Sequence, residues 1–486
     1  MQLKNVIKKY GCMPVQVKAS LWFLICAFLQ RGISGLTTPI FTRLLTTSEY
    51  GKYNVFSSWQ SIITCLVTLN LFGGMYSQGL VKRDENERDS YSSSLLGLTT
   101  TMSLVWTGIY FCFCRFWNHL FSVDVFQMIM MLLIIWSSTV YNFWAVRQRV
   151  ELKYKKLVGV TLATSLLNPI LSIVLVTMSD DKVTARILGT AIIDVTIYIL
   201  LFVSQMKNGK KYYSKHDWKY ALTFCIPLIP HYLSQMVLNS SDRIMIQKLV
   251  DDSTAGIYSL AYSVSMIMTL FNSSLIQTIE PWIFQKIKEG KVENIKRVAY
   301  PSFAIIAVVN IVLIAFAPEV IKIFAPKEYY DAIWVIPPIA MSVFFMFMYS
   351  FFALFEFYFE KPQYITIATI VGALLNVILN YFCIKKFGYL AAGYTTLVCY
   401  VIYALMHYMF MKKVLKENMN DIRVYDMRII IALTAIFMIL SFGLMATYTT
   451  PIIRYIALAF MFVLIFIKKK LIFTTVRDLI SVKKLK

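Results

Sequence analysis

The sequence is poor in charged residues. Only 15% of its 486 residues are charged, and 26 acidic residues stand against 48 lysines and arginines. Hydrophobic residues make up 58% of the chain, and the mean hydropathy is positive. Soluble domains usually carry about 25% charged residues. The composition therefore excludes an ordinary soluble protein and predicts an integral membrane protein.

Several missing features exclude whole classes of function. There is no GxxxxGK[ST] phosphate loop, so ATP is not the direct energy source. No predicted loop is longer than about twenty residues, which argues against a glycosyltransferase or a glycan polymerase with a large extramembrane part. The eight cysteines show neither disulfide nor metal spacing. Without a soluble basic domain, the net charge of +22 is assigned to loops that face anionic lipid. We expect no enzyme, cofactor, metal site or nucleic-acid partner.

Fourteen apolar runs are long enough to cross about 30 Å of hydrocarbon as helices. Roughly three-quarters of the Lys and Arg residues fall in alternate loops and at the two ends, as the positive-inside rule requires if both termini are cytoplasmic. No cleavage site follows the first run, so we expect that helix to be retained. The sequence thus predicts an all-α polytopic membrane protein. The runs lie at roughly 20–42, 54–76, 91–114, 124–145, 157–178, 184–204, 219–241, 254–277, 299–317, 333–355, 364–384, 388–410, 426–447 and 450–467.

The seventh run is interrupted by two prolines. Pro227 and Pro230 remove backbone donors from its middle and predict a broken helix. Four polar residues then follow on one helical side, at spacings of four, four and three. A polar group that faces hydrocarbon is expensive, so we expect the stripe to face other helices or a watery cavity. The stripe consists of His231, Gln235, Asn239 and Asp242.

Parts of the first half recur in the second half. The block 43–53 matches 248–258, and the run LLNPIL at 166–171 matches LLNVIL at 374–379. Gln30 also matches Gln235 in register with the first block. Collinear matches of this kind indicate an internal duplication, and repeats in membrane proteins usually indicate a transporter. The predicted domains are 1–205 (helices 1–6), 206–412 (helices 7–12) and 413–486 (helices 13–14 with a basic cytoplasmic tail).

Four segments resemble a known family. Segment 31–53 (RGISGLTTPIFTRLLTTSEYGKY) resembles the first-helix pattern of bacterial O-antigen and polysaccharide flippases of the Wzx type, and segment 226–258 resembles their seventh helix. Glu280-Pro281-Trp282 resembles the end of their eighth helix, and segment 372–400 resembles helices eleven and twelve. The resemblance implies the multidrug, lipid-oligosaccharide and polysaccharide exporter superfamily. Its fold has two six-helix bundles, related by a pseudo-twofold axis, around a central cavity; here two C-terminal helices are added.

The resemblance also implies a function. Such a flippase moves an undecaprenyl-pyrophosphate-linked oligosaccharide across the bacterial inner membrane by alternating access, coupled to H⁺ or Na⁺. The implied partners are this lipid-linked oligosaccharide, membrane lipids, and a polysaccharide polymerase with other assembly proteins. Three alternatives stay open. They are a flippase for the peptidoglycan precursor lipid II, a MATE-like drug exporter and, from a different class, a membrane glycan polymerase.

Three ionisable residues at membrane depth are the first site candidates. Arg31 lies near the middle of helix one, where a guanidinium can bind phosphate through two hydrogen bonds; the alternative is an ion pair with Asp194. Asp194 lies inside helix six, where an unpaired carboxylate is costly. It is interpreted either as a coupling site for H⁺ or Na⁺ or as the partner in a structural ion pair. His231 is either a pH-dependent group or an interhelical hydrogen-bonding residue.

The remaining candidates follow from the resemblance or from amide chemistry. Asp242 and Arg243 match the family's pair at the outer end of helix seven and, with Glu280, are assigned to a gate or a structural salt bridge. Glu356, Glu360 and Lys361 are interpreted as a solvated helix face. Amide side chains at membrane depth can bind sugar hydroxyls or join helices. These cavity candidates are Gln30, Gln235, Asn239, Asn272, Gln277, Asn376 and Asn380.

Overall fold

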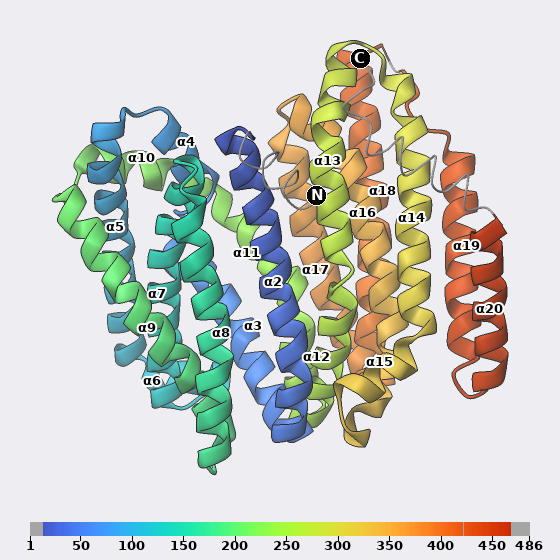
Figure 1. Ribbon diagram of the computed structural model, residues 1–486, viewed down its shortest axis with the longest axis horizontal. Coiled ribbons are helices and arrows are strands. Elements are labelled where there is room, and N and C mark those ends of the chain that lie inside the picture. Colours follow the sequence, from blue (N-terminus) through green and yellow to red (C-terminus); the bar gives the residue numbers. More distant parts are fainter. Residues whose placement is uncertain (1–12, 421, 468–486) are drawn as a thin grey trace, which may run out of the picture. The chain divides into compact units, whose positions relative to one another are not determined.

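The computed structural model describes residues 13–420 and 422–467, with the side chains of 460–467 outside the description. Every secondary-structure element in this part of the chain is helical (Figure 1). Within these described residues, twelve helical stretches are long and apolar enough to cross a membrane. The prediction of an all-α polytopic membrane protein is therefore confirmed. The predicted basic tail after residue 467 lies outside the described residues.

The chain forms two compact units that meet in sequence between Ser240 and Ser241. We describe each unit by itself. The first contains α2 (Val15–Leu44), α3 (Thr47–Thr68), α4 (Gly74–Val81), α5 (Glu85–Cys112), α6 (Cys114–Phe121), α7 (Val125–Val150), α8 (Tyr154–Met178), α9 (Lys182–Gly209), α10 (Lys215–Cys225), η1 (Ile226–Leu228) and the first half of α11 (Ile229–Leu249).

The second unit continues from the same helix α11. Its further elements are α12 (Asp252–Met266), α13 (Thr269–Lys288), η2 (Val292–Asn294), α14 (Lys296–Ala315), α15 (Ala317–Phe324), η3 (Lys327–Trp334), α16 (Ile336–Tyr358), α17 (Pro362–Phe387), α18 (Ala391–Asn418), α19 (Met427–Ala446) and α20 (Pro451–Ile467).

Side-chain caps fix several helix starts. Thr46 and Glu49 form a capping box at the start of α3, in which each side chain accepts from the other residue's backbone N–H. Asp181 and Asp251 accept hydrogen bonds from backbone N–H groups three residues later, at the starts of α9 and α12. These two acids of the short turns therefore serve as N-caps.

The second apolar run, predicted at 54–76, is broken. Helix α3 ends at Thr68, and both Leu69 and Asn70 have positive φ, at 48° and 50°. Non-glycine residues rarely adopt this left-handed conformation, so the helix cannot continue through them. The chain resumes as the short helix α4, and neither piece is among the twelve spans. The other run outside the twelve is α20, which the structure describes only to Ile467.

The predicted break in the seventh run is confirmed. Helix α10 ends at Cys225, a 3₁₀ turn covers 226–228, and α11 starts again at Ile229. Helix α10 is anchored to the first unit, because Trp218 Nε1 donates to the carbonyl of Ser94 at 2.9 Å and Asp217 pairs with Arg83 at 2.9 Å.

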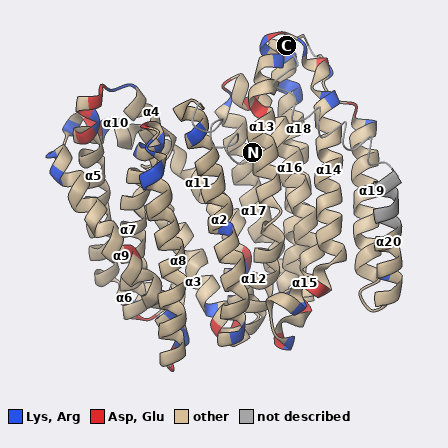
Figure 2. Cartoon of the chain, in the orientation of Figure 1, with Lys and Arg blue, Asp and Glu red and all other residues tan. Residues whose placement is uncertain are grey.

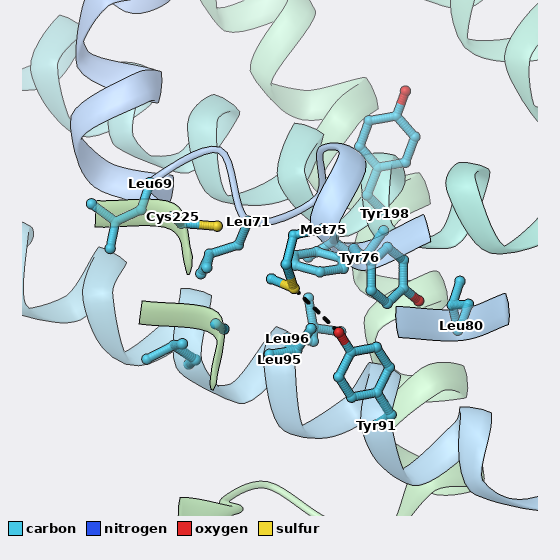
Figure 3. Packing of buried hydrophobic residues seen from close by; sticks show 14 residues of the cluster. Leu69, Leu71, Met75, Tyr76, Leu80, Tyr91, Leu95, Leu96, Tyr198 and Cys225 are labelled. Atoms are coloured by element: carbon cyan, nitrogen blue, oxygen red, sulfur yellow. Dashed lines mark hydrogen bonds between the residues drawn. The ribbon is translucent and has the colours of Figure 1, made fainter. Parts of the chain in front are cut away.

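The first unit has an aromatic core at the junction of α4, α5 and α7 (Figure 3). Tyr76 is fully buried and packs edge-on against Phe143, with ring centroids 4.8 Å apart. The Tyr91 hydroxyl donates to the sulfur of Met75 at 3.3 Å. In both units Lys, Arg, Asp and Glu gather toward the helix ends, while the helix bodies are mostly uncharged (Figure 2). This distribution is that of helices crossing an apolar layer.

Helix α16 is the core of the second unit. Of its span, 83% is buried within the structure, and its phenylalanines pack against α14 and α19. Phe303 of α14 packs edge-on against Phe347, with ring centroids 6.0 Å apart. Phe437 of α19 packs against Phe344, and their ring centroids are 4.4 Å apart. A helix that is apolar on all sides has to be enclosed by others, as α16 is.

Candidate functional site

A cavity of about 330 Å³ lies inside the first unit, between helices α2, α3, α8 and α9. We call it the polar pocket, because most of its lining side chains carry hydroxyl, amide or guanidinium groups. Such groups are rare at membrane depth unless they face a cavity or other helices. The lining residues are Gln30, Ile33, Ser34, Thr37, Phe41, Tyr53, Ser165, Asn168, Pro169, Ser172, Arg186 and Thr190.

Helical spacing explains how α2 supplies one wall. Its residues 30, 34, 37 and 41 follow one another at intervals of four, three and four, which places them on the same face. Gln30 Nε2 donates to Ser165 Oγ at 3.3 Å and joins this wall to α8. Gly189 allows α9 to approach α8, because a Cβ there would lie only 2.6 Å from the Cα of Ser172.

Arg186 is held in the pocket by aromatic rings. Its guanidinium carbon lies 3.6 Å from the ring centroid of Tyr53, 3.9 Å from that of Phe41 and 5.5 Å from that of Tyr50. Cation–π contacts of this kind hold a guanidinium without neutralising its charge. Nη1 of Arg186 is buried and has no hydrogen-bond partner among the described residues. The pocket therefore contains a fixed positive charge with donor capacity left over.

Asp194 lies beside the pocket and is held by one of its lining residues. The carboxylate is 7% exposed, and its Oδ1 accepts from Asn168 Nδ2 at 3.0 Å. No ion pair joins Asp194 to Arg31 within residues 13–420 and 422–467. Arg31 is exposed on its unit and does not line the pocket, although its neighbour Gln30 does. A role of Arg31 in substrate binding stays a prediction.

The second unit contains a buried polar network around Asp242. The Asp242 side chain is 1% exposed and accepts from Tyr258 at 2.7 Å, Thr396 at 2.8 Å and Asn380 at 2.6 Å. Asn376 lies within hydrogen-bonding distance of Asn380, at 3.2 Å, and accepts from Ser241 at 2.9 Å. We call these six residues the Asp242 cluster. The three groups that donate to its carboxylate are all neutral.

The other predicted site residues are spread over both units. In the first unit, His231, Gln235 and Asn239 are half-buried, and Nδ1 of His231 is buried without a partner among the described residues. In the second unit, Arg243 lies over the ring of Tyr262 at 4.2 Å. There, Asn272 donates to the Val343 carbonyl at 2.9 Å, Gln277 is exposed and Glu280 is half-buried.

The interpretation of Glu356 as part of a solvated helix face is wrong. Its side chain is fully buried in the second unit, and its Oε1 lies 2.8 Å from Nδ1 of His407, which is also fully buried. Tyr349 stacks on the imidazole, with ring centroids 5.3 Å apart. Because α16 packs along α18, the C-terminal end of α16 is covered and Glu356 meets a partner 51 residues away in sequence. Glu360 is exposed, and Lys361 pairs with Glu417 at 3.2 Å.

The duplicated positions contribute to the polar groups of both units. Tyr53 holds Arg186 in the first unit, and Tyr258, its match in the repeat, donates to Asp242 in the second. Asn168 likewise holds Asp194, whereas its match Asn376 belongs to the Asp242 cluster. The repeat has therefore kept polar residues at the same positions with different partners.

Sequence reasoning missed Arg186, although a signal was present. The residue lies inside the apolar run predicted at 184–204, and an ionisable residue within a span is by default a site candidate. Its aromatic partners are on other helices and were not visible in the sequence. No group of three or more His, Cys, Asp or Glu residues suited to a metal ion occurs among the residues that the structure describes.

Comparisons with known proteins agree with this architecture. Residues 17–287 match the family model described as polysaccharide biosynthesis protein, and residues 227–382 match the MatE model. An uncharacterized membrane protein of Haemophilus influenzae is 22% identical over 373 residues, which are 74% of this chain and 88% of that protein.

Two solved structures share the fold. One is titled lipid II flippase MurJ in an inward closed conformation, with a TM-score of 0.71, 15% identity and coverage of 93% of this chain and 100% of that one. The other is an inward-facing multidrug resistance MATE family transporter, with a TM-score of 0.61, 14% identity and coverage of 80% and 96%. The chain thus belongs to the polysaccharide biosynthesis protein family and is a multi-pass membrane transporter of the multidrug, lipid-oligosaccharide and polysaccharide exporter superfamily.

Proposed function

We propose that this chain translocates an undecaprenyl-pyrophosphate-linked oligosaccharide across the bacterial inner membrane, by alternating access and without catalysing a covalent step. The polar headgroup of such a substrate has to cross an apolar layer, while its lipid tail can stay in the bilayer. The family match and the polar pocket both support this substrate class. The termini are proposed to be cytoplasmic, from the distribution of Lys and Arg.

The observation that carries the proposal is the chemistry of the polar pocket. Hydroxyl and amide groups on four helices offer donors and acceptors to sugar hydroxyls. Arg186 adds a guanidinium whose Nη1 is unused by described residues. A guanidinium binds phosphate oxygens through two parallel hydrogen bonds, which suits a pyrophosphate group. A pocket for an apolar cation would need the opposite charge.

The test replaces Arg186 by glutamine in a strain that depends on this protein for surface polysaccharide. Charge-assisted hydrogen bonds contribute about 1.5–3 kcal/mol, so we expect transport to fall by roughly tenfold or more. Arg186→Lys keeps the charge but not the paired geometry and should be intermediate. Arg43→Gln is the matched control, because Arg43 is exposed and does not line the pocket. Wild-type glycan export by normally inserted Arg186→Gln protein would refute the role.

We also propose that transport is coupled to H⁺ or Na⁺ through buried carboxylates. Asp194 is the candidate in the first unit and Asp242 in the second. The described donors to the Asp242 carboxylate are all neutral. Hard cations prefer oxygen ligands, which the Asp242 cluster supplies as carboxylate, amide and hydroxyl groups. Na⁺ should then raise the thermal stability of the purified protein relative to K⁺, and Asp242→Asn should abolish the difference. An equal response of wild type and variant would remove Asp242 from the coupling.

A lipid II flippase is the second candidate, because the neighbour with that title shares the fold over 93% of the chain. Both substrates carry a polyprenyl pyrophosphate, so the polar pocket suits either. Depletion of the protein separates them. Accumulation of a polysaccharide repeat unit on the cytoplasmic leaflet supports the first function, and accumulation of the peptidoglycan precursor supports the second.

A further inference from the structure

A second large cavity, of about 570 Å³, lies in the second unit at the linker between α18 and α19. We call it the cationic pocket. Four cations line it, Lys296, Lys412, Arg423 and Arg428, and Asp426 is the single described acid in its lining. The Asp426 carboxylate is engaged as the N-cap of α19, accepting from the backbone N–H of Arg428 at 2.9 Å. None of the four cations is ion-paired with a described acidic side chain.

Tyr425 also lines the cationic pocket, and its hydroxyl is a hydrogen-bond donor without a described acceptor. Its side chain is 6% exposed, and its ring packs edge-on against Phe352 with centroids 5.6 Å apart. The hydroxyl is buried and has no hydrogen-bond partner among the described residues. Burial raises the pKa of this hydroxyl, with Tyr300 adding to the effect, so it keeps its proton. A buried hydroxyl without a partner is costly, and an acceptor bound in the pocket would remove that cost.

An apolar groove continues from the cationic pocket along α16, α18 and α19. Its volume is about 330 Å³, its lining is almost wholly apolar, and it shares Tyr408 and Met427 with the cationic pocket. On α19 it runs from Met427 to Met438, a rise of about 16 Å at 1.5 Å per residue. Half of a hydrocarbon layer of about 30 Å is the same length. The groove is therefore as long as one leaflet is deep.

We propose that the cationic pocket and the apolar groove together bind one anionic phospholipid. The phosphate lies among Lys412, Arg423 and Arg428 and accepts from Tyr425, and one acyl chain fills the groove beside α19. Charge complementarity selects an anionic headgroup over a zwitterionic one. Basic pockets between helices on the cytoplasmic side suit such headgroups, and the α18–α19 linker is on that side in the positive-inside assignment. The inference does not depend on which substrate the protein transports.

The experiment uses the full-length protein purified in a neutral detergent. Dioleoyl-phosphatidylglycerol or dioleoyl-phosphatidylcholine is titrated in, and the melting temperature and the retained lipid by native mass spectrometry are measured. We expect phosphatidylglycerol to bind at least tenfold more tightly, since each basic residue near an anionic lipid contributes about 1 kcal/mol. K412Q/R423Q/R428Q should abolish this preference. K385Q/K386Q, at the exposed end of α17, is the control for loss of positive charge outside the pocket and should retain it.

Two single variants keep the test valid if the triple variant does not fold. Tyr425→Phe removes only the hydroxyl and should weaken phosphatidylglycerol binding several-fold. Ala435→Trp fills the groove from an exposed position and should block the acyl chain while leaving the cations in place. Unchanged phosphatidylglycerol binding in both would overturn the proposal.

Further competition experiments distinguish a lipid phosphate from a free phosphate as the ligand of the cationic pocket. Inorganic pyrophosphate and glycerol phosphate, which lack a tail, should not displace phosphatidylglycerol at equal concentration. If either tail-less anion displaced bound phosphatidylglycerol as effectively as added phosphatidylglycerol does, the site would be a free-anion site and the proposal would be overturned. Undecaprenyl phosphate that binds tightly where phosphatidylglycerol does not would assign the site to a transported lipid and overturn it as well.

Discussion

Asn168 Nδ2 donates a hydrogen bond to Asp194 Oδ1 over 3.0 Å, and this bond joins α8 to α9 at the polar pocket. Asn168 also lines that pocket, so one amide connects the proposed substrate site to a buried carboxylate. A change in the charge of Asp194 would alter the hydrogen bonding of a residue that lines the polar pocket. The proposed coupling would then be local and would need no long pathway.

The first prediction concerns this bond. Asn168→Ala leaves the buried Asp194 carboxylate without its described donor, and such a loss costs about 1–3 kcal/mol. The thermal stability of the purified protein should fall accordingly. Ser165→Ala is the control on the same helix. Ser165 accepts a weak bond from Gln30, at 3.3 Å, and donates within its own helix to the carbonyl of Thr161 at 2.7 Å, so its loss leaves no buried carboxylate without a donor. Equal melting temperatures for Asn168→Ala and Ser165→Ala would contradict the assignment.

The second prediction concerns the Asp242 cluster. Tyr258→Phe removes one of the three donors to the buried carboxylate and should cost about 1–3 kcal/mol of stability. Asp242→Leu removes the acceptor. The double variant Asp242→Leu with Tyr258→Phe should cost less than the sum of the two single effects, because contacting residues are not independent. A double-mutant cycle on thermal or denaturant unfolding measures this. Strict additivity would mean that the hydrogen bond of 2.7 Å contributes nothing.

The third prediction separates a buried pair from an exposed one. His407→Phe leaves Glu356 uncompensated in a dry interior and should destabilise the second unit by about 3–5 kcal/mol. Replacing both residues, as Glu356→Leu with His407→Phe, should cost much less. Glu417→Gln breaks the exposed pair with Lys361 and should cost at most about 1 kcal/mol. Unfolding in a mild detergent gives the free energy of unfolding of all three variants. A small loss of stability in the single variant His407→Phe would contradict the prediction.

The fourth prediction is a pH dependence outside the membrane spans. Partial burial works to raise the pKa of Glu151, but hydrogen bonds from Lys153 and Arg147 outweigh it and lower the pKa below 4.5. A carboxyl whose pKa is lower in the folded state stabilises the protein above its unfolded pKa. That contribution is lost as the pH falls through the folded value.

Glu151→Gln should therefore melt below wild type at pH 7, and the gap should close as the pH is lowered below about 4.5. Melting temperatures at several pH values measure it. A gap that widens on acidification would have the wrong sign. Glu289→Gln is a second comparison, because Lys286 lowers the pKa of this exposed carboxyl in the same direction.

Sequence reasoning succeeded where the signal is local. Pro227 and Pro230, three residues apart, interrupt the seventh run, because each ring removes a donor and clashes with the preceding turn. Apolar length and loop charge likewise predicted most of the spans. The break after Thr68 was missed, because Leu69 gives no warning of a left-handed conformation and Asn70, which adopts it more readily, lies within an apolar run.

The site depended on contacts that no sequence pattern shows. Arg186 is identified as a site residue by its cation–π contacts with Phe41 and Tyr53, which lie on other helices. Glu356 looked solvated because it follows an apolar run and precedes Glu360 and Lys361, yet α18 covers it. Amide residues could face sugar or other helices by pattern alone, and in the structure Asn376 and Asn380 are buried in the Asp242 cluster.

The Glu356–His407 pair also constrains the order in which the protein can be assembled. Translation delivers α16 to the bilayer before α17 and α18 exist, so the carboxylate at its C-terminal end should at first be in contact with headgroups and water. The two helices can pack over this pair only after residue 407 has emerged from the ribosome, because an unpaired carboxylate in the apolar layer is costly. We therefore expect α16 to dock against α18 only after residue 407 has been inserted, as a late step in the assembly of the second unit.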